Sequence, residues 1–251
     1  MVALLQPERA VAHGRERAPA VDERARIGGS AWEGFRAVFR SPYLLGVSGY
    51  VLILAVMVTF IYFTRLQMVA ALGEGVDMRA GVFAQIDLAT QVAVLVLQLL
   101  VTGRLMKRLG VHLTLALLPL TVALGFIGLA IVGSLIALVL FEATFRAVQR
   151  AIMRPARETL FTVVSREEKY KAKAFIDTFG YRAGDAVGAQ TEGLLGRIGM
   201  GLTALAAVAV PLALAWAVLG IWLGRTQQRL AQRRAALDAG AVGTEPQAEG
   251  A

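Results

Sequence analysis

Ionisable side chains stand within long apolar stretches of this sequence, and they are the residues with the most chemistry to offer. If the stretches cross a bilayer, each such charge costs at least a few kcal/mol unless it faces a cavity or a partner. Guanidinium and carboxylate groups held there can bind anions, exchange ion-pair partners or carry protons. The residues concerned are Asp87, Glu142, Arg146, Arg150, Asp177, Arg182, Asp185 and Glu192.

Glu142 and Arg146 are spaced four residues apart with the acid first, the favourable order for an ion pair on a helix. Helical geometry places Gln149, Arg150 and Met153 on the same stripe. Two interpretations remain open. In the first, the pair only stabilises the helices, and Arg150 extends to the lipid headgroups. In the second, the guanidinium of Arg146 binds a phosphate or carboxylate in a central cavity.

The stretch 175–196 is the most polar of the apolar stretches. A Ser165–Glu168 capping box predicts the start of its helix. One arc of that helix, about 140° wide, carries polar side chains, and one flank of the arc carries a ladder of glycines that permits close helix packing. A packed seam of mutually neutralised charges explains the glycines, whereas a water-accessible pathway better explains the width of the arc. The pathway residues are Asp177, Tyr181, Arg182 and Asp185, and the glycines are Gly180, Gly184 and Gly188.

No catalytic constellation accompanies these charges. The chain has no Cys and two His, and it contains no nucleophile elbow, zinc-protease motif or phosphate-binding loop. Thiol chemistry and Cys/His zinc sites are therefore excluded. We expect no enzymatic activity, no cofactor and no metal.

The elements that position these residues are predicted to be membrane helices. Hydrophobic residues make up 57% of the chain, charged residues 18%, and the mean hydropathy is +0.61. A span needs about 20 apolar residues, and the sequence predicts an all-α polytopic membrane protein with six transmembrane helices. We expect a charged tail at 1–41, a six-helix domain at 42–224 and a second tail at 225–251. The predicted spans are 43–64, 83–103, 111–131, 133–153, 175–196 and 201–223.

The distribution of Lys and Arg predicts the orientation. Of these 26 residues, 20 lie in segments on the side of the N-terminus and three on the other. Cytoplasmic segments carry the excess of positive charge, so both termini are expected in the cytoplasm and the protein in the cell (inner) membrane. The net charge of +8 is then a topology signal, and the expected partner is the lipid bilayer rather than nucleic acid.

Two segments resemble known transporters. Gly103-Arg-Leu-Met-Lys-Arg-Leu-Gly110 is similar to the short cytoplasmic loop of major-facilitator transporters. The segment 154–184 resembles the ATP/ADP (NTP/NDP) exchange carriers. The matching elements are Arg157-Glu158, the alternating Lys169, Lys171 and Lys173, Ile176-Asp177, and the Gly-x-Arg-x-Gly of 180–184. The family has a Lys where this chain has Asp185.

The resemblance covers residues 30–225 and corresponds to the C-terminal six helices of that twelve-helix family. It implies one half of a major-facilitator fold that moves an anionic solute, with nucleotide-like solutes among the candidates, by alternating access. In this interpretation Arg146 and Arg182 are substrate or gate groups, and Glu142, Asp177 and Asp185 are their partners or proton carriers. Alternating access requires a second six-helix half, either a separate chain or a second copy bound through the glycine ladder. The alternative is a non-transporting structural or assembly subunit, or a degenerate transporter fragment.

Overall fold

A computed structural model describes residues 31–71, 76–100, 102–197 and 201–242, which are almost entirely helical and contain no strand. Two of the helical segments are π-helical turns, and one is a 3-10 turn. In chain order the elements are α1 Ala31–Arg40, α2 Pro42–Ala70, α3 Val76–Leu100, α4 Thr102–Val132, α5 Leu135–Val148, η1 Gln149–Met153, α6 Arg154–Leu160, η2 Phe161–Val163, α7 Arg166–Phe175, η3 Ile176–Gly180, α8 Tyr181–Arg197 and α9 Leu202–Val242.

Three of the six predicted spans are confirmed as helices long and apolar enough to cross a membrane. They are Pro42–Ala70, Gly110–Val132 and Leu202–Leu237. Their length and composition are those of membrane-spanning helices.

The other three predicted spans are helical, but length or charge separates them from the first three. The apolar part of α3 is the shorter segment Phe83–Leu97. The span predicted at 133–153 corresponds to α5 and η1, and it continues as helix into α6. The span predicted at 175–196 begins at the end of α7 and runs through η3 into α8. Their role as membrane spans stays a prediction.

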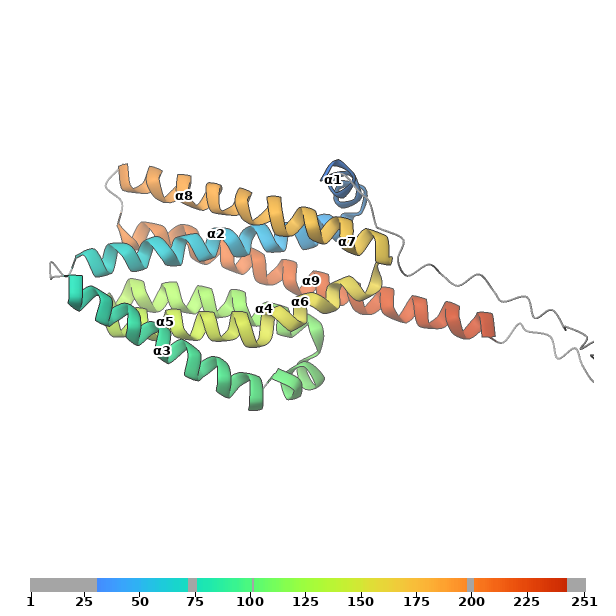
Figure 1. Cartoon of the computed structure of the whole chain (residues 1–251), viewed down its shortest axis with the longest axis horizontal. Helices are drawn as coiled ribbons and strands as arrows, with labels where there is room; N and C mark the ends of the chain where they lie inside the picture. The colour runs from blue at the N-terminus through green and yellow to red at the C-terminus, as the bar shows by residue number, and fades with distance from the viewer. Residues whose placement is uncertain (1–30, 72–75, 101, 198–200, 243–251) are drawn as a thin grey trace, which may run out of the picture.

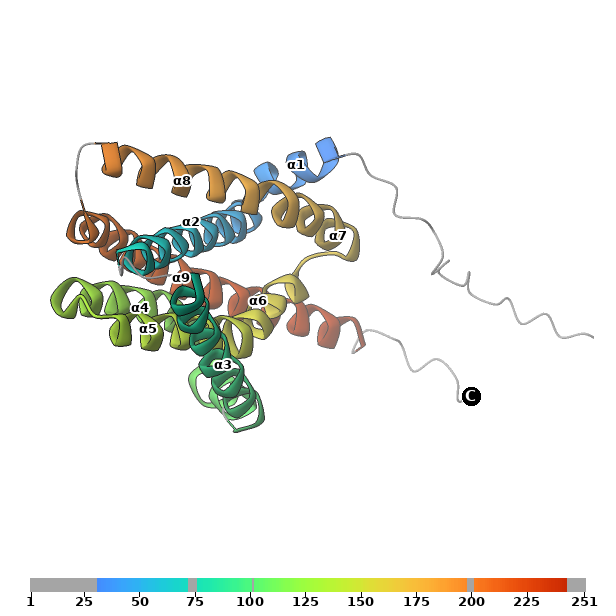
Figure 2. The same cartoon turned by 60° about the vertical axis from the view of Figure 1, so that its left-hand side comes forward.

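Successive long helices along the chain run in opposite directions, so that the neighbours α2 and α8 are parallel, and α3 is inclined to the others (Figures 1 and 2). The principal packing pairs are α4 with α9, α2 with α8 and α3 with α5. Tyrosine hydroxyls fix α2 to its neighbours: Tyr50 donates a hydrogen bond to the carbonyl of Leu115 at 2.7 Å, and Tyr43 donates one to the carbonyl of Leu160 at 2.8 Å. These bonds pair buried hydroxyl groups that would otherwise be costly in an apolar core.

The turn between α4 and α5 follows from two adjacent residues. Gly133 has a φ of +60°, a conformation that favours glycine, and it ends α4. Ser134 then caps α5, because its hydroxyl accepts a hydrogen bond from the amide of Ala137. This short turn returns the chain antiparallel and places Glu142 and Arg146 of α5 in the bundle. The predicted capping box of Ser165 and Glu168 is also present at the start of α7.

Glycines allow α8 to approach α2 closely. A Cβ at Gly184 would lie 2.5 Å from the Cβ of Ala55 and 2.6 Å from the carbonyl oxygen of Leu52. A Cβ at Gly188 would lie 2.8 Å from the Cβ of Thr59. The glycine ladder therefore packs inside the chain, against α2. The sequence had suggested that the ladder could bind a second copy of the chain, but α2 already occupies that face.

The predicted tails also differ from the structure. Residues 1–30 lie outside the described part of the chain, but residues 31–40, assigned to the charged tail, form helix α1. This helix packs on α7, and that tertiary contact stabilises a segment too short to be helical alone. At the other end, α9 has 41 residues and continues through the predicted boundary at 224.

Candidate functional site

Two adjoining cavities lie between α2 and the continuous segment formed by α5, η1 and α6. The first has a volume of about 300 Å³ and is bounded by α2, α5 and η1. The second, of about 290 Å³, is bounded by α2, η1, α6 and α8. Val58, Gln149 and Arg150 line both cavities. The two cavities therefore form one cleft along α2, which we call the α2 cleft.

Most of the charged side chains that line the α2 cleft are arginines. Four arginines of α5, η1 and α6 form a stripe along one wall of the cleft, and Arg65 of α2 lines the first cavity with them. The arginines that line the cleft are Arg65, Arg146, Arg150, Arg154 and Arg157, and the acids that line it are Glu142 and Asp185. A cleft with this excess of guanidinium groups is suited to an anion.

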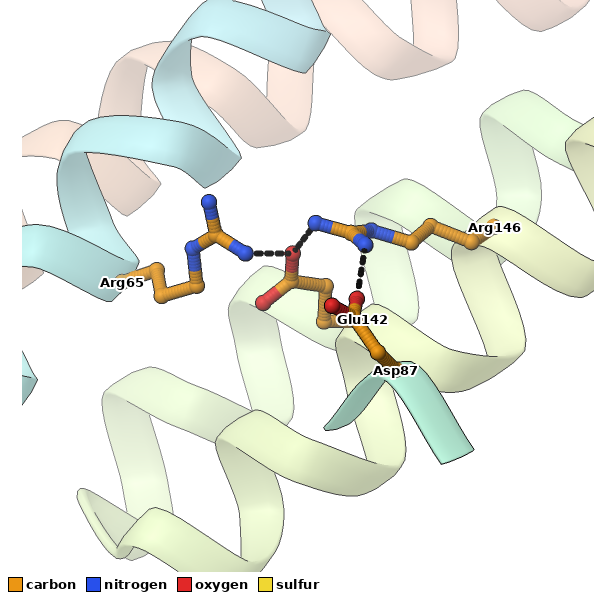
Figure 3. A network of polar contacts seen from close by, with 4 residues as sticks. All are labelled: Arg65, Asp87, Glu142 and Arg146. Carbon is orange, nitrogen blue, oxygen red and sulfur yellow. Dashed lines mark hydrogen bonds and ion pairs between the residues drawn. The ribbon is translucent and has the colours of Figure 1, made fainter. Parts of the chain in front are cut away.

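Four of the side chains around the first cavity form one ion-pair network, shown in Figure 3. The carboxylate of Glu142 contacts Nη1 of Arg65 at 3.1 Å and also Nη2 of Arg146. Arg146 in turn donates from Nη1 to Asp87 of α3 at 2.7 Å. The network joins α2, α5 and α3, and its two acids match its two arginines. We refer to these four residues as the tetrad.

The tetrad is buried at its centre. The side chain of Glu142 is 2% exposed and that of Arg65 15% exposed, whereas Asp87 at the edge is 62% exposed. Arg65 also lies 4.9 Å from the centroid of the Phe83 ring, within cation–π range. An unpaired charge at such a depth would be strongly destabilising, so these charges depend on one another.

Arg157 is the centre of a second group of polar contacts. Its Nη1 donates to the hydroxyl of Tyr181 at 2.9 Å and lies 3.8 Å from the carboxylate of Asp177. Nearby, Asp185 accepts a hydrogen bond from the hydroxyl of Thr59 at 3.3 Å. These polar groups connect α6 to η3 and α8, and the side chain of Arg157 is 12% exposed.

Arg150 and Arg154 differ from the other arginines of the α2 cleft. Arg150 lines both cavities and Arg154 the second. Within the residues that the structure describes, neither forms an ion pair. Their guanidinium groups, one helical turn apart, are the ones available to a bound anion.

The structure brings most of the predicted pathway residues to the α2 cleft. Glu142 and Arg146 meet in the tetrad, and Tyr181 and Asp185 line the second cavity. Asp177 is next to that cavity through its contact with Arg157. Arg182, in contrast, is exposed and lines neither cavity. The role of substrate or gate group predicted for Arg182 therefore has no geometric support.

Two central arginines were not among the predicted pathway residues. Arg65 was placed outside the membrane because the span was expected to end at residue 64, but α2 continues to Ala70. Arg157 was assigned to a cytoplasmic loop, but helix continues from α5 through η1 into α6. The helical spacing of Arg146, Arg150, Arg154 and Arg157 was the signal that could have identified the stripe.

The three alternating lysines of the carrier-like segment lie on α7, away from the α2 cleft. Lys171 contacts Glu167 at 2.6 Å, and Lys173 contacts Glu158 at 2.8 Å. Lys169 is half-buried on the same helix, α7. No group of three potential metal ligands occurs among the described residues.

No protein-family model, curated protein or solved structure matches the chain. The resemblance to the exchange carriers and to the major-facilitator fold consequently rests on the motifs quoted above.

Proposed function

We propose that the protein is one half of a secondary membrane transporter and that it moves an anionic solute through the α2 cleft. The observation that carries this proposal is the presence of Arg150 and Arg154, two guanidinium groups without an ion pair in the described part of the chain, beside cavities of about 300 and 290 Å³. Guanidinium groups bind phosphate and carboxylate through two parallel hydrogen bonds. Unpaired arginines are costly as purely structural elements of a membrane bundle, which favours a ligand.

The tetrad is assigned a gating role in this proposal. Its carboxylates already satisfy Arg65 and Arg146, so an anion that entered the first cavity would compete with Glu142 for them. Exchange of such partners can couple binding to movement of α2, α3 and α5, because each of these helices contributes a residue. The ion pairs would thus close the cleft on the side of the tetrad when no solute is bound.

A second six-helix half completes the proposal. Asp87 is 62% exposed, and Asp177, Arg182 and Asp185 are exposed as well. Charged groups do not face lipid at such density, and transporters bind solutes between two halves. Since α2 covers the glycine ladder, we assign the partner to the exposed polar side of α3 and α8. The cytoplasmic side is the one with α1 and the end of α9, as the distribution of Lys and Arg suggests.

The test is anion binding by the full chain purified in detergent, followed by counterflow after reconstitution together with its second half. Inorganic phosphate, a dicarboxylate, ADP and ATP are compared by the shift that each produces in the unfolding temperature. One of them should stabilise the protein, and Arg150→Gln with Arg154→Gln should weaken its binding by about tenfold or more. Arg233→Gln with Arg234→Gln removes the same charge from the exposed end of α9 and is the matched control.

One observation favours a different function, a structural or assembly subunit. All four charges of the tetrad are paired, as expected if they only hold three helices together. In that case no anion stabilises the chain, and the double substitution at 150 and 154 changes neither binding nor flux. That outcome would overturn the transport proposal.

A further inference from the structure

Helix α1 lies across the direction of the long helices. In Figure 1 it is seen end-on while α2, α8 and α9 extend along the picture, and Figure 2 shows its length. It is located at the end of the bundle where α2 begins and α7 lies. Where long apolar helices span a bilayer they follow its normal, so a helix that lies across them runs along the membrane surface.

Close packing fixes one face of α1 on α7. A Cβ at Gly34 would lie 2.7 Å from the carbonyl oxygen of Lys171, so the two helix backbones are in near contact. Val38 is fully buried, and the ring of Phe35 meets that of Phe175 edge-on at 5.8 Å. Helix α1 is thereby held in one orientation on α7.

Outside this contact, α1 exposes an aromatic ring and two cations. Phe39 is 57% exposed, and Arg36 and Arg40 are both exposed. Neither arginine pairs with an acid in the described part of the chain. An exposed aromatic side chain next to basic residues is the arrangement by which helices bind at the boundary between headgroups and acyl chains.

A groove of about 750 Å³ between α1 and α7 contains the two arginines. Its acids are already engaged, since Glu167 contacts Lys171 at 2.6 Å and the carboxylate of Glu168 accepts hydrogen bonds from the amide and hydroxyl of Ser165. Arg36 and Arg40 therefore remain for an external anion. Their position level with the start of α2 makes a lipid phosphate the nearest source of one.

We propose that α1 is a membrane-surface helix that binds anionic phospholipid. Phe39 inserts among the acyl chains, and Arg36 and Arg40 contact the phosphate groups of lipids such as phosphatidylglycerol. The contact with α7 transmits the position of the membrane surface to η3 and α8. This inference is independent of the proposed transport function, because it uses neither the α2 cleft nor a solute.

The experiment takes advantage of the absence of cysteine in the chain. A single cysteine at Phe39→Cys carries an environment-sensitive fluorophore in the full chain, reconstituted into vesicles of phosphatidylcholine with about 30 mol% phosphatidylglycerol. A spin label placed shallowly in the acyl chains should quench this fluorophore about threefold more than one at Leu237→Cys. Leu237 is 73% exposed near the end of α9 and serves as the aqueous reference.

Charge variants identify the lipid. Arg36→Gln with Arg40→Gln should reduce quenching at position 39, as should pure phosphatidylcholine vesicles. Arg233→Gln with Arg234→Gln, the same change in net charge on α9, should leave it unchanged. The inference is wrong if the label at 39 is quenched no more than the reference, or if its quenching does not depend on phosphatidylglycerol. Protection of the label from aqueous iodide without lipid quenching would indicate a protein partner and would overturn it too.

Discussion

The two cavities of the α2 cleft have nearly equal volumes and share Arg150, but the arginines around them differ in whether they form ion pairs. Around the first, every arginine of the tetrad contacts a carboxylate. Around the second, Arg157 is paired but Arg154 is not, and Asp185 is exposed and bonded only to a threonine among the described contacts. The tetrad beside the first cavity is fully paired, whereas Arg154 of the second cavity and the shared Arg150 form no ion pair in the described part of the chain.

This difference separates two uses of buried charge that look alike in a sequence. Charges that satisfy one another hold helices together, and removal of one partner is expensive. Charges without a partner form no ion pair in the folded state and are available to a ligand. Substitutions in the two cavities should therefore affect stability and binding in opposite proportions.

The largest effect on stability is expected for Glu142→Gln in the first cavity. The amide leaves Arg65 and Arg146 without their shared anion at a site where the native carboxylate is 2% exposed. The cost should be about 3–5 kcal/mol in the free energy of unfolding, measured by thermal and denaturant unfolding in detergent. Asp185→Asn in the second cavity is the control and should cost less than about 1 kcal/mol. If the two variants lost the same free energy of unfolding, the distinction between the two cavities would be wrong.

The next largest effect is expected for Gly184→Ala in the seam between α2 and α8. The added methyl group meets Ala55 and the backbone of Leu52 at 2.5 and 2.6 Å, and overpacking of this kind costs about 1–3 kcal/mol. Because α8 must shift, the second cavity should change and the tetrad should not. Gly193→Ala, where a Cβ meets nothing within 4 Å, is the matched control and should be neutral or stabilising.

A smaller effect on stability distinguishes the two kinds of arginine within the second cavity. Arg157→Gln removes the contacts with Tyr181 and Asp177 and should cost about 1–3 kcal/mol. Arg150→Gln removes no ion pair and should change stability by no more than about 0.5 kcal/mol, while anion binding falls. The comparison of the two cavities fails if Arg150→Gln is the more destabilising substitution.

The smallest effect concerns the surface contact between α6 and α7, outside the α2 cleft. The hydrogen bond from Lys173 lowers the pKa of Glu158 below its ordinary value. This pair stabilises the fold above the ordinary pKa of a glutamate, about 4.3, and the stabilisation is lost as the pH falls through the lowered value. As the pH falls from about 5 to 3, the free energy of unfolding should decrease more for the native chain than for Lys173→Met. The difference between the two decreases should be less than about 1 kcal/mol. Unfolding measured against pH tests this difference, and an equal loss in both proteins would contradict it.

The apolar helices and their caps could be predicted from the sequence because each depends on local pattern. The three apolar spans and the capping box of Ser165 and Glu168 follow from hydropathy and from residue spacing. The pair of Glu142 and Arg146 follows from spacing on one helix. Such features require no knowledge of which helices are neighbours.

Features that depend on tertiary contact were missed or misplaced. Helix α1 forms because α7 packs against it, and the glycine ladder is occupied by α2, which is distant in sequence. The partners of Glu142 on α2 and of Arg146 on α3 could not be read from spacing on α5. Arg182 belongs to the Gly-x-Arg-x-Gly motif but lies outside the cleft. The first turns of α8 orient Tyr181 and Asp185 toward the cleft instead.

The uninterrupted length of α9 has a mechanical consequence. Its 41 residues exceed the roughly 20 that a bilayer requires, so about 20 residues, or about 30 Å, continue as the same rod beyond the apolar layer. A tilt of about 10° within the bundle would displace the tip of such a rod by about 5 Å. A distance probe on the protruding end of α9 would therefore report helix movements that are too small to detect inside the bundle.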